Sequence, residues 1–309
     1  MKHRSFFWGC LFFLFTTGKF CGCSSESNAD KVTDTPASGR ITISVDESFK
    51  PVMEEQIRMY ESSYPGTTIH VQYKSEADCL NDLLKQDSVR LIIVSRLPKE
   101  DERAFLKTNL GYSPAAGVLA FDGIALVQHP SDQDTLFTNE RLRAELSGKS
   151  KATHTYLMDG YNATSTVAYM RDSVMRGLPF DSTVVRALPN TRAVLDYVAT
   201  HPGSLGFVGL GWIGDQHDTA QLAMLDRLKF GYLSCEQCPQ KPFFKPSQEH
   251  LNAGCYQFTR KVCYIMKENH TGLGSGFISF LRYERGQLIF KNAFLGTIMN
   301  FQVRDVRLR

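Results

Sequence analysis

The spacing of apolar residues along the chain predicts strands and helices in alternation. Residues 41–45 and 68–73 alternate apolar and polar side chains, as strands do, and a stretch of helical spacing between them ends at Pro65-Gly66. Such a unit implies parallel strands. Further strands are expected at residues 90–95, 118–127 (broken at Asp122-Gly123), 155–158, 205–208 and 257–266. Further helices are expected at residues 78–85, 99–107, 139–146, 167–176, 194–200, 276–282 and 286–293, with 231–254 irregular.

This alternation predicts an α/β architecture. Open α/β sheets bind ligands at the carboxyl ends of their strands. Three predicted strand ends carry hydroxyl-bearing polar turns, at Ser48, at Ser95-Arg96 and at residues 164–166. These turns are the candidate ligand-binding positions.

The turn Thr164-Ser165-Thr166 lies between a short apolar strand and the start of a helix. Backbone N–H groups at a helix start attract anions, and hydroxyl groups both donate and accept hydrogen bonds. An ordinary helix cap explains the same residues, because Ser and Thr are common caps. The turn alone does not separate an anion site from a cap.

The first 22 residues are typical of a signal peptide. A basic start is followed by an apolar core too short to span a bilayer. Phe20-Cys21-Gly22-Cys23 then resembles a bacterial lipobox, which predicts lipidation at Cys23, although Phe20 and Lys19 depart from it and leave ordinary signal peptidase as an alternative. The polar residues 23–39 predict a flexible tether, and the folded domain is expected to span 40–309.

Charge and composition exclude several classes of function. The chain has 35 Lys and Arg against 32 Asp and Glu, and three of the basic residues lie in the signal, so the remainder is neutral and no nucleic-acid partner is expected. The eight His are scattered, without the clustering of a hydrolytic or metal centre. We therefore expect no enzymatic activity, no metal and no cofactor.

The cysteines allow three interpretations. Cys79, Cys235, Cys238, Cys255 and Cys263 remain after the signal and lipid positions are set aside, so at least one should be free. Cys235 and Cys238 have the spacing of redox motifs, but Pro239 and Pro242 favour an extended loop over a helix start. Local disulfides are favoured over a redox centre and over a zinc site built from Cys235, Cys238, Cys255 and Cys263.

Eight short motifs, in order, resemble those of the bacterial phosphate-binding proteins that serve ABC transporters. Ser95-Arg96-Leu97-Pro98 resembles a Ser-Arg-Pro-Leu segment, and Thr164-Ser165-Thr166 stands where that family has Ser-Gly-Thr. The other motifs lie at residues 41–51, 121–127, 136–149, 202–207, 258–260 and 284–287. The chain thus resembles a PstS-like member of the periplasmic binding protein superfamily, from a lipoprotein branch common in Bacteroidota.

The resemblance implies a two-lobed, type 2 fold with mixed, mostly parallel sheets and a two-strand hinge. Lobe one would comprise about 40–122 and 211–309, and lobe two about 123–210. A ligand would lie between them. The residues implied to bind it are Ser48, Phe49, Ser95, Arg96, Thr164, Ser165 and Thr166.

Two positions depart from the phosphate pattern. Arg96 stands where the family has a carboxylate that accepts the proton of hydrogen phosphate, and Gly160 stands near the place of a family arginine. One interpretation is that Arg96 supplies the missing guanidinium. The alternative is a surface arginine that serves the turn after it. Arg260 is expected to be solvated or salt-bridged, and Asp122 to be either a hinge residue or a ligand.

The resemblance implies non-enzymatic binding of a small inorganic oxyanion, first of all phosphate, for uptake through an ABC permease. The protein is expected to be a monomer anchored by lipid in the cell envelope, facing the periplasm. Ser24 after Cys23 favours the outer membrane over the inner. The alternative is an oxyanion sensor or a structural outer-membrane lipoprotein that kept the fold without transport.

Overall fold

The computed structural model describes residues 34–160, 164–299 and 301. The predicted signal peptide, the lipidation position Cys23 and residues 24–33 of the predicted tether lie outside the described residues. Among the residues that are described, no helix has the length and apolar character needed to cross a membrane.

The folded part begins before residue 40, earlier than predicted. Asp34 is only 4 % exposed, and its Oδ2 lies 2.6 Å from Nη2 of Arg90. The same oxygen accepts the Leu273 N–H at 2.8 Å. Strand β1 (Ser38–Asp46) then starts directly. Residues 34–39, predicted as tether, are therefore part of the folded domain, because a partly buried ion pair holds Asp34 and Ser38 begins β1.

Acid is expected to weaken this anchor. Arg90 is the main cause that lowers the pKa of Asp34, from 3.8 to about 2. A carboxyl group whose pKa is lower in the folded state stabilises the fold at pH values above its unfolded-state pKa. This contribution is lost as the pH falls through the folded-state pKa, about 2. Between pH 5 and pH 2, the free energy of unfolding measured in urea should fall by about 2 kcal/mol more in the wild type than in Asp34→Asn. Equal losses in the two proteins would contradict this assignment.

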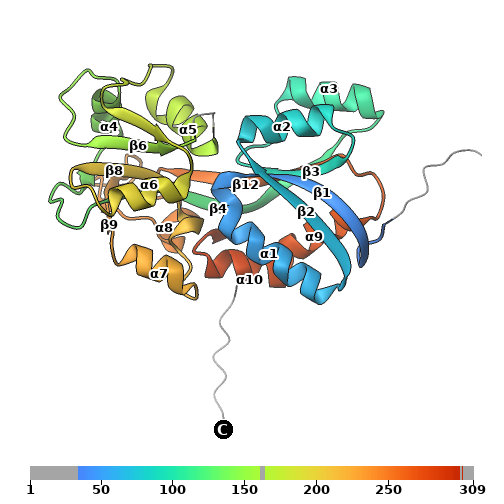
Figure 1. Ribbon diagram of the computed structural model, residues 1–309. Coiled ribbons are helices and arrows are strands. Elements are labelled where there is room, and N and C mark those ends of the chain that lie inside the picture. Colours follow the sequence, from blue (N-terminus) through green and yellow to red (C-terminus); the bar gives the residue numbers. More distant parts are fainter. Residues whose placement is uncertain (1–33, 161–163, 300, 302–309) are drawn as a thin grey trace, which may run out of the picture. The chain divides into compact units, whose positions relative to one another are not determined.

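The first half of the molecule is a sheet in the order β2-β1-β3-β12-β4. β1 pairs in parallel with β2 (Gly66–Lys74) and β3 (Val89–Val94), as the alternating pattern predicts. Helix α1 (Lys50–Ser63) connects β1 to β2 and has Pro51 in its first turn, where proline lacks no hydrogen bond. The carboxyl end of β1 and the start of α1 therefore lie together beside the hinge (Figure 1).

Two strands form the hinge. β4 (Ala115–Gln128) pairs with β12 (Thr259–Met266) up to Gly123 and with β8 (Ser204–Gly209) from Ile124 onward. The predicted break at Asp122-Gly123 is wrong, because the strand continues there and only changes its partner. The expected two-strand hinge is confirmed, with the second crossing at the start of β12.

The second half is a sheet in the order β4-β8-β6-β7. β6 (Thr155–Asp159) lies parallel to β8 and to β7 (Val185–Leu188). The apolar pattern did not predict the strand β7. All pairs made by β4 and β12 are antiparallel. The two-lobed α/β fold with mixed sheets is confirmed, but the expected mostly parallel pairing is wrong: of the strand pairs in the described residues, five are parallel and six antiparallel, because the strands at the hinge pair antiparallel.

The hydrophobic cores divide between the two halves, and they correct the predicted lobe boundary. Two clusters in the first half take their side chains from residues 41–120 and 262–295, and the core of the second half, the second core, takes them from residues 124–258. The second core includes Ile213, Met224, Leu233 and Leu251, which were expected in lobe one. These residues belong there because β9 (Lys229–Phe230) returns to pair with the second part of β4.

The remaining elements connect the strands or cover the sheets. They are η1 (Glu47–Phe49), α2 (Glu76–Lys85), α3 (Glu100–Leu110), β5 (Leu136–Phe137), α4 (Asn139–Leu146), α5 (Ser165–Tyr169), the π-helical η2 (Met170–Met175), α6 (Thr191–Val198), η3 (Leu210–Trp212), α7 (Thr219–Leu225), β10 (Tyr232–Ser234), β11 (Phe243–Phe244), α8 (Gln248–Asn252), α9 (Leu273–Arg282), α10 (Glu284–Asn292) and β13 (Gly296–Thr297).

Candidate functional site at the hinge

A buried arginine marks the centre of the hinge. Arg260 is the second residue of β12, and its pairing partner on β4 is Asp122. Both side chains are almost fully buried, with exposures of 2 % and 1 %. Nε and Nη2 of Arg260 donate to Oδ2 of Asp122 at 2.9 and 2.8 Å. This ion pair fixes the guanidinium and leaves Nη1 free to point elsewhere.

Nη1 of Arg260 donates to two hydroxyl groups of the second half, and these contact a hydroxyl group of the first half. It donates to Ser165 Oγ at 2.9 Å and to Thr166 Oγ1 at 3.0 Å. Ser48 Oγ, in η1 directly after β1, lies 3.2 Å from Ser165 Oγ and 3.4 Å from Thr166 Oγ1. Two of the three predicted strand-end turns, distant in sequence, thus meet each other, and the Arg260 guanidinium contacts one of them. We call Ser48, Ser165, Thr166 and Arg260 the donor cluster.

A carboxylate already occupies this cluster. Asp46 Oδ1 accepts the Ser48 N–H at 2.9 Å and the Ser165 hydroxyl at 2.8 Å. Its Oδ2 accepts the Ser165 N–H at 3.2 Å. Asp46 belongs to the first half and Ser165 to the second, so these bonds hold the two halves together. Backbone and hydroxyl donors here converge on an anionic group.

The region around the cluster is acidic. Burial raises the pKa of Glu47 to about 7, and the charges of Asp159 and Asp46 add to the effect. Burial also raises the pKa of Asp159, although a hydrogen bond from Thr191 opposes it. Burial alone would lower the pKa of Arg260, but the nearby carboxylates, Asp122 foremost, outweigh it and raise the pKa. The arginine therefore stays charged among an excess of carboxyl groups.

Phe49 and Thr164, two further predicted ligand residues, have structural contacts. Phe49 is buried, and its ring centroid lies 5.0 Å from the Arg260 guanidinium carbon. Thr164 Oγ1 accepts the Val167 N–H at 3.3 Å as the cap of α5 and lies 3.0 Å from Asp159 Oδ1. Both residues support the cluster, and Thr164 fits the cap interpretation.

Ser95 and Arg96 contact other carboxylates. Ser95 donates to Glu76 Oε2 from both its N–H and its hydroxyl, at 2.7 and 2.5 Å. Arg96 makes two 2.7 Å bonds to Glu102 of α3 and donates to the Leu97 carbonyl at 3.3 Å. These contacts match the alternative in which Arg96 serves the turn after it. The guanidinium that reaches the hydroxyl groups is that of Arg260.

Two residues of the site were missed in the sequence. Arg260 was expected to be solvated or salt-bridged, and it is salt-bridged but buried at the cluster. Asp46 was not considered. Two signals were available in the sequence. One was a charged residue at the start of β12, where the chain returns to the first half, and the other was an acid directly after the alternating strand residues 41–45.

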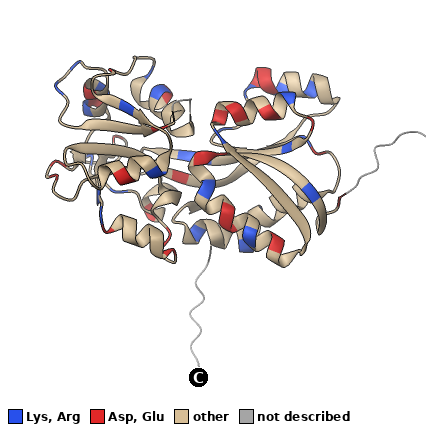
Figure 2. Cartoon of the chain, in the orientation of Figure 1, with Lys and Arg blue, Asp and Glu red and all other residues tan. Residues whose placement is uncertain are grey.

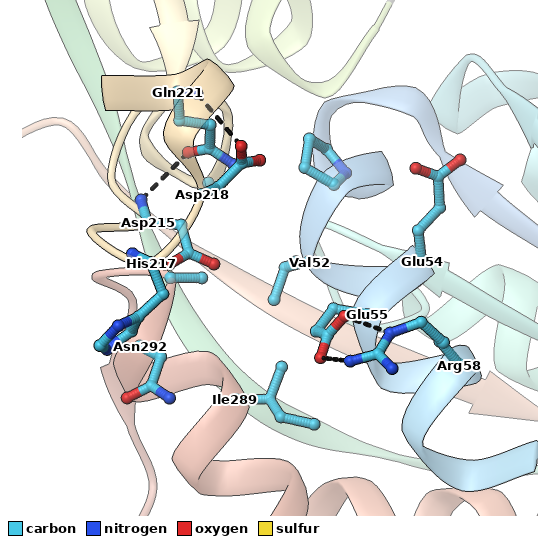
Figure 3. A pocket seen from close by; sticks show the side chains of 13 residues that line it. Val52, Glu54, Glu55, Arg58, Asp215, His217, Asp218, Gln221, Ile289 and Asn292 are labelled. Carbon is cyan, nitrogen blue, oxygen red and sulfur yellow. Dashed lines mark hydrogen bonds and ion pairs between the residues drawn. The ribbon is translucent and has the colours of Figure 1, made fainter. Parts of the chain in front are cut away.

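A separate pocket of about 550 Å³ lies between α1, α7 and α10 (Figure 3). Its lining includes Glu54, Asp215 and Asp218, whereas Arg58 is bound to Glu55. The Asp218 carboxylate caps α7 by accepting the Ala220 and Gln221 N–H groups. An acidic lining of this kind does not favour an anion, so the pocket is not the candidate site.

The other charged groups do not suggest a different ligand. Figure 2 shows acidic and basic residues mixed along the helices. Asp34, Glu268 and His270 lie close enough together to hold a metal, but Arg90 pairs with both carboxylates, at 2.6 and 3.4 Å. A guanidinium in that position leaves little negative charge for a cation.

Comparisons with known proteins place the fold. A family model described as the PBP superfamily domain matches residues 30–284. No curated protein matches the sequence. Among solved structures, a substrate-binding protein from Clostridium perfringens with bound phosphate is similar, with 17% identity, a TM-score of 0.67, and coverage of 84% of this chain and 100% of the other.

Two further structures agree. An ABC-type phosphate transport receptor from Vibrio cholerae has 19% identity and a TM-score of 0.62 over 83% of this chain and 99% of its own. PstS from Borrelia burgdorferi has 16% identity and a TM-score of 0.53 over 85% of this chain and 100% of its own. At these identities the likeness concerns the fold. The family model covers most of the chain, and the protein therefore belongs to the PBP superfamily of periplasmic binding proteins.

Proposed function

We propose that this protein binds a small inorganic oxyanion, phosphate first of all, at the donor cluster, and that it does so without chemical conversion. The observation that carries the proposal is the Asp46 carboxylate. Two backbone N–H groups and a hydroxyl converge on its oxygens. Groups that hold a carboxylate can hold another oxyanion in its place, and the charged Arg260 lies directly beside them.

The ligand would enter by displacing Asp46 and the hydrogen bonds among the hydroxyl groups. These bonds join the two halves, so binding requires the hinge to open and close again. A closed, poorly hydrated cleft strengthens each remaining bond to the ligand. The similar structures are substrate-binding proteins with this fold, which supports binding rather than catalysis.

Asp46 would also set selectivity among anions. An oxyanion that still carries a proton can donate it to the carboxylate, whereas fully ionised sulfate is repelled. Asp46 would thus accept the proton of hydrogen phosphate, which Arg96, a donor, cannot do. Ser95 and Arg96 would join the site only if they released Glu76 and Glu102.

The decisive experiment is isothermal titration calorimetry on residues 24–309 with phosphate. Wild type is expected to bind, and Ser165→Ala to bind about tenfold more weakly, because it loses a hydroxyl worth about 1.4 kcal/mol. Ser173→Ala removes an exposed hydroxyl near the same helix and should leave affinity unchanged. Arg96→Ala should cause little change. No heat with phosphate at millimolar concentration would contradict the proposal, and a large loss in Arg96→Ala would move the site toward Ser95 and Arg96.

We further propose that Cys23 carries a lipid anchor in the cell envelope, in the outer membrane rather than the inner, and that the protein is a monomer. Delivery of the ligand to an ABC permease requires contact with the inner membrane, so anchoring in the outer membrane would separate the protein from such a permease. The lipobox-like residues and the superfamily membership support this placement. The acidic surroundings of the cluster favour the second candidate function, a sensor or structural lipoprotein without transport. Binding by an Asp46 variant but not by the wild type would support that second function.

A further inference from the structure

Three sulfur atoms lie together away from the donor cluster. Cys235 and Cys238 form a disulfide, and the Cys255 Sγ lies within 4.8 Å of both of their sulfurs. Cys255 is a free thiol and is partly exposed. The disulfide loop and the Cys255 segment are in direct contact, because Gln237 donates to the Gly254 carbonyl. This proximity places a potential nucleophile beside an existing disulfide.

The other described free cysteines lack this arrangement. Cys79 and Cys263 are buried in the first half. Burial raises the pKa of Cys263 to about 12, and it raises the pKa of Cys79 as well. Since the thiolate is the reactive form, both residues should be inert.

We propose that Cys235, Cys238 and Cys255 form one thiol–disulfide exchange site. The Cys255 thiolate attacks Cys235 Sγ, a Cys235–Cys255 bond forms, and the Cys235–Cys238 bond breaks. Its electron pair leaves on the Cys238 sulfur, which takes up a proton from water. One disulfide and one thiol are present before and after, so the step needs no oxidant.

Burial decides which sulfur leaves. Cys235 is fully buried, whereas Cys238 is partly exposed. A thiolate is better solvated at the exposed position, and a better-solvated leaving thiolate favours attack on Cys235. The product exposes the Cys238 thiol, which can react with a small disulfide or with a cysteine of a partner protein. It also ties β10 to the segment that leads into the hinge strand β12.

The experiment maps the disulfides of the full chain, purified without reductant. The protein is held at pH 8.5, quenched in acid, and its thiols are blocked with N-ethylmaleimide. Cleavage after Glu236 and Glu249 puts Cys235, Cys238 and Cys255 on three different peptides, which mass spectrometry can pair. Both Cys235–Cys238 and Cys235–Cys255 peptides are expected in the wild type.

Variants keep the test decisive. Cys255→Ser should lose the second cross-link completely, and Cys263→Ser, the matched control, should retain it. Cys238→Ser treated with oxidised glutathione should form Cys235–Cys255. Detection of Cys235–Cys238 alone in the wild type, together with a Cys255 that stays free in Cys238→Ser, would overturn the proposal. None of these outcomes depends on oxyanion binding.

Discussion

Asp46→Asn is expected to bind sulfate at least tenfold more tightly than the wild type, and to gain less for phosphate. The substitution keeps a side-chain oxygen for the Ser48 N–H but removes a full negative charge from the donors. Two like charges 4 Å apart repel by about 4 kcal/mol at the effective dielectric of a protein surface. A third of that energy is already a tenfold change in affinity. Calorimetry with sulfate and with phosphate measures both effects.

The matched control is Asp101→Asn, which changes the formal charge equally at an exposed residue of α3. It should leave both affinities unchanged. Equal gains for sulfate in the two variants would show a general charge effect and reject Asp46 as the selective group. If Asp46→Asn binds neither anion while remaining folded, the donor cluster does not bind oxyanions at all.

Arg260→Leu is expected to destabilise the protein by about 3–5 kcal/mol, the usual result of leaving a buried charge without its partner. Asp122 is fully buried and has both of its guanidinium bonds from this one residue. The lost hydrogen bonds to Ser165 and Thr166 add to the effect. The free energy of unfolding in urea measures the loss directly.

The double variant Arg260→Leu/Asp122→Leu separates charge from packing. Removing both charges should recover most of the lost stability, because paired apolar replacements are often neutral. Arg171→Leu is the control, since Arg171 is exposed and its ion pair among the described residues is with its neighbour Asp172; it should change stability by less than about 0.5 kcal/mol. A double variant as unstable as Arg260→Leu would show that the contacts of Arg260 with the hydroxyl groups, not with Asp122, hold the hinge.

The local pattern of apolar and polar residues was sufficient to predict most of the helices and strands. Strands β1, β2 and β3 follow from alternation and apolar runs, and α1 follows from helical spacing that ends at Pro65-Gly66. Such signals depend only on residues a few positions apart. β7 was missed because it is only four residues long, Val-Arg-Ala-Leu, which is too short to show an alternating period. The short elements at 219–252 gave no clear period, and their assignment to the second core required the pairing of β9 with β4.

The candidate site shows the same division between local and distant information. The sequence by itself determined the fold class, the hydroxyl turns at Ser48 and Ser165, and their place at strand ends. It favoured Arg96 as the guanidinium of the site and expected Arg260 only to be solvated or salt-bridged, because nothing in the local pattern sets Arg260 beside the hydroxyl turns. Only the tertiary structure decided for Arg260, because the register of β12 on β4 sets it opposite Asp122, 138 residues away. The hinge likewise brings Asp46 within hydrogen-bond distance of Ser165 across 119 residues, a contact that local patterns do not encode.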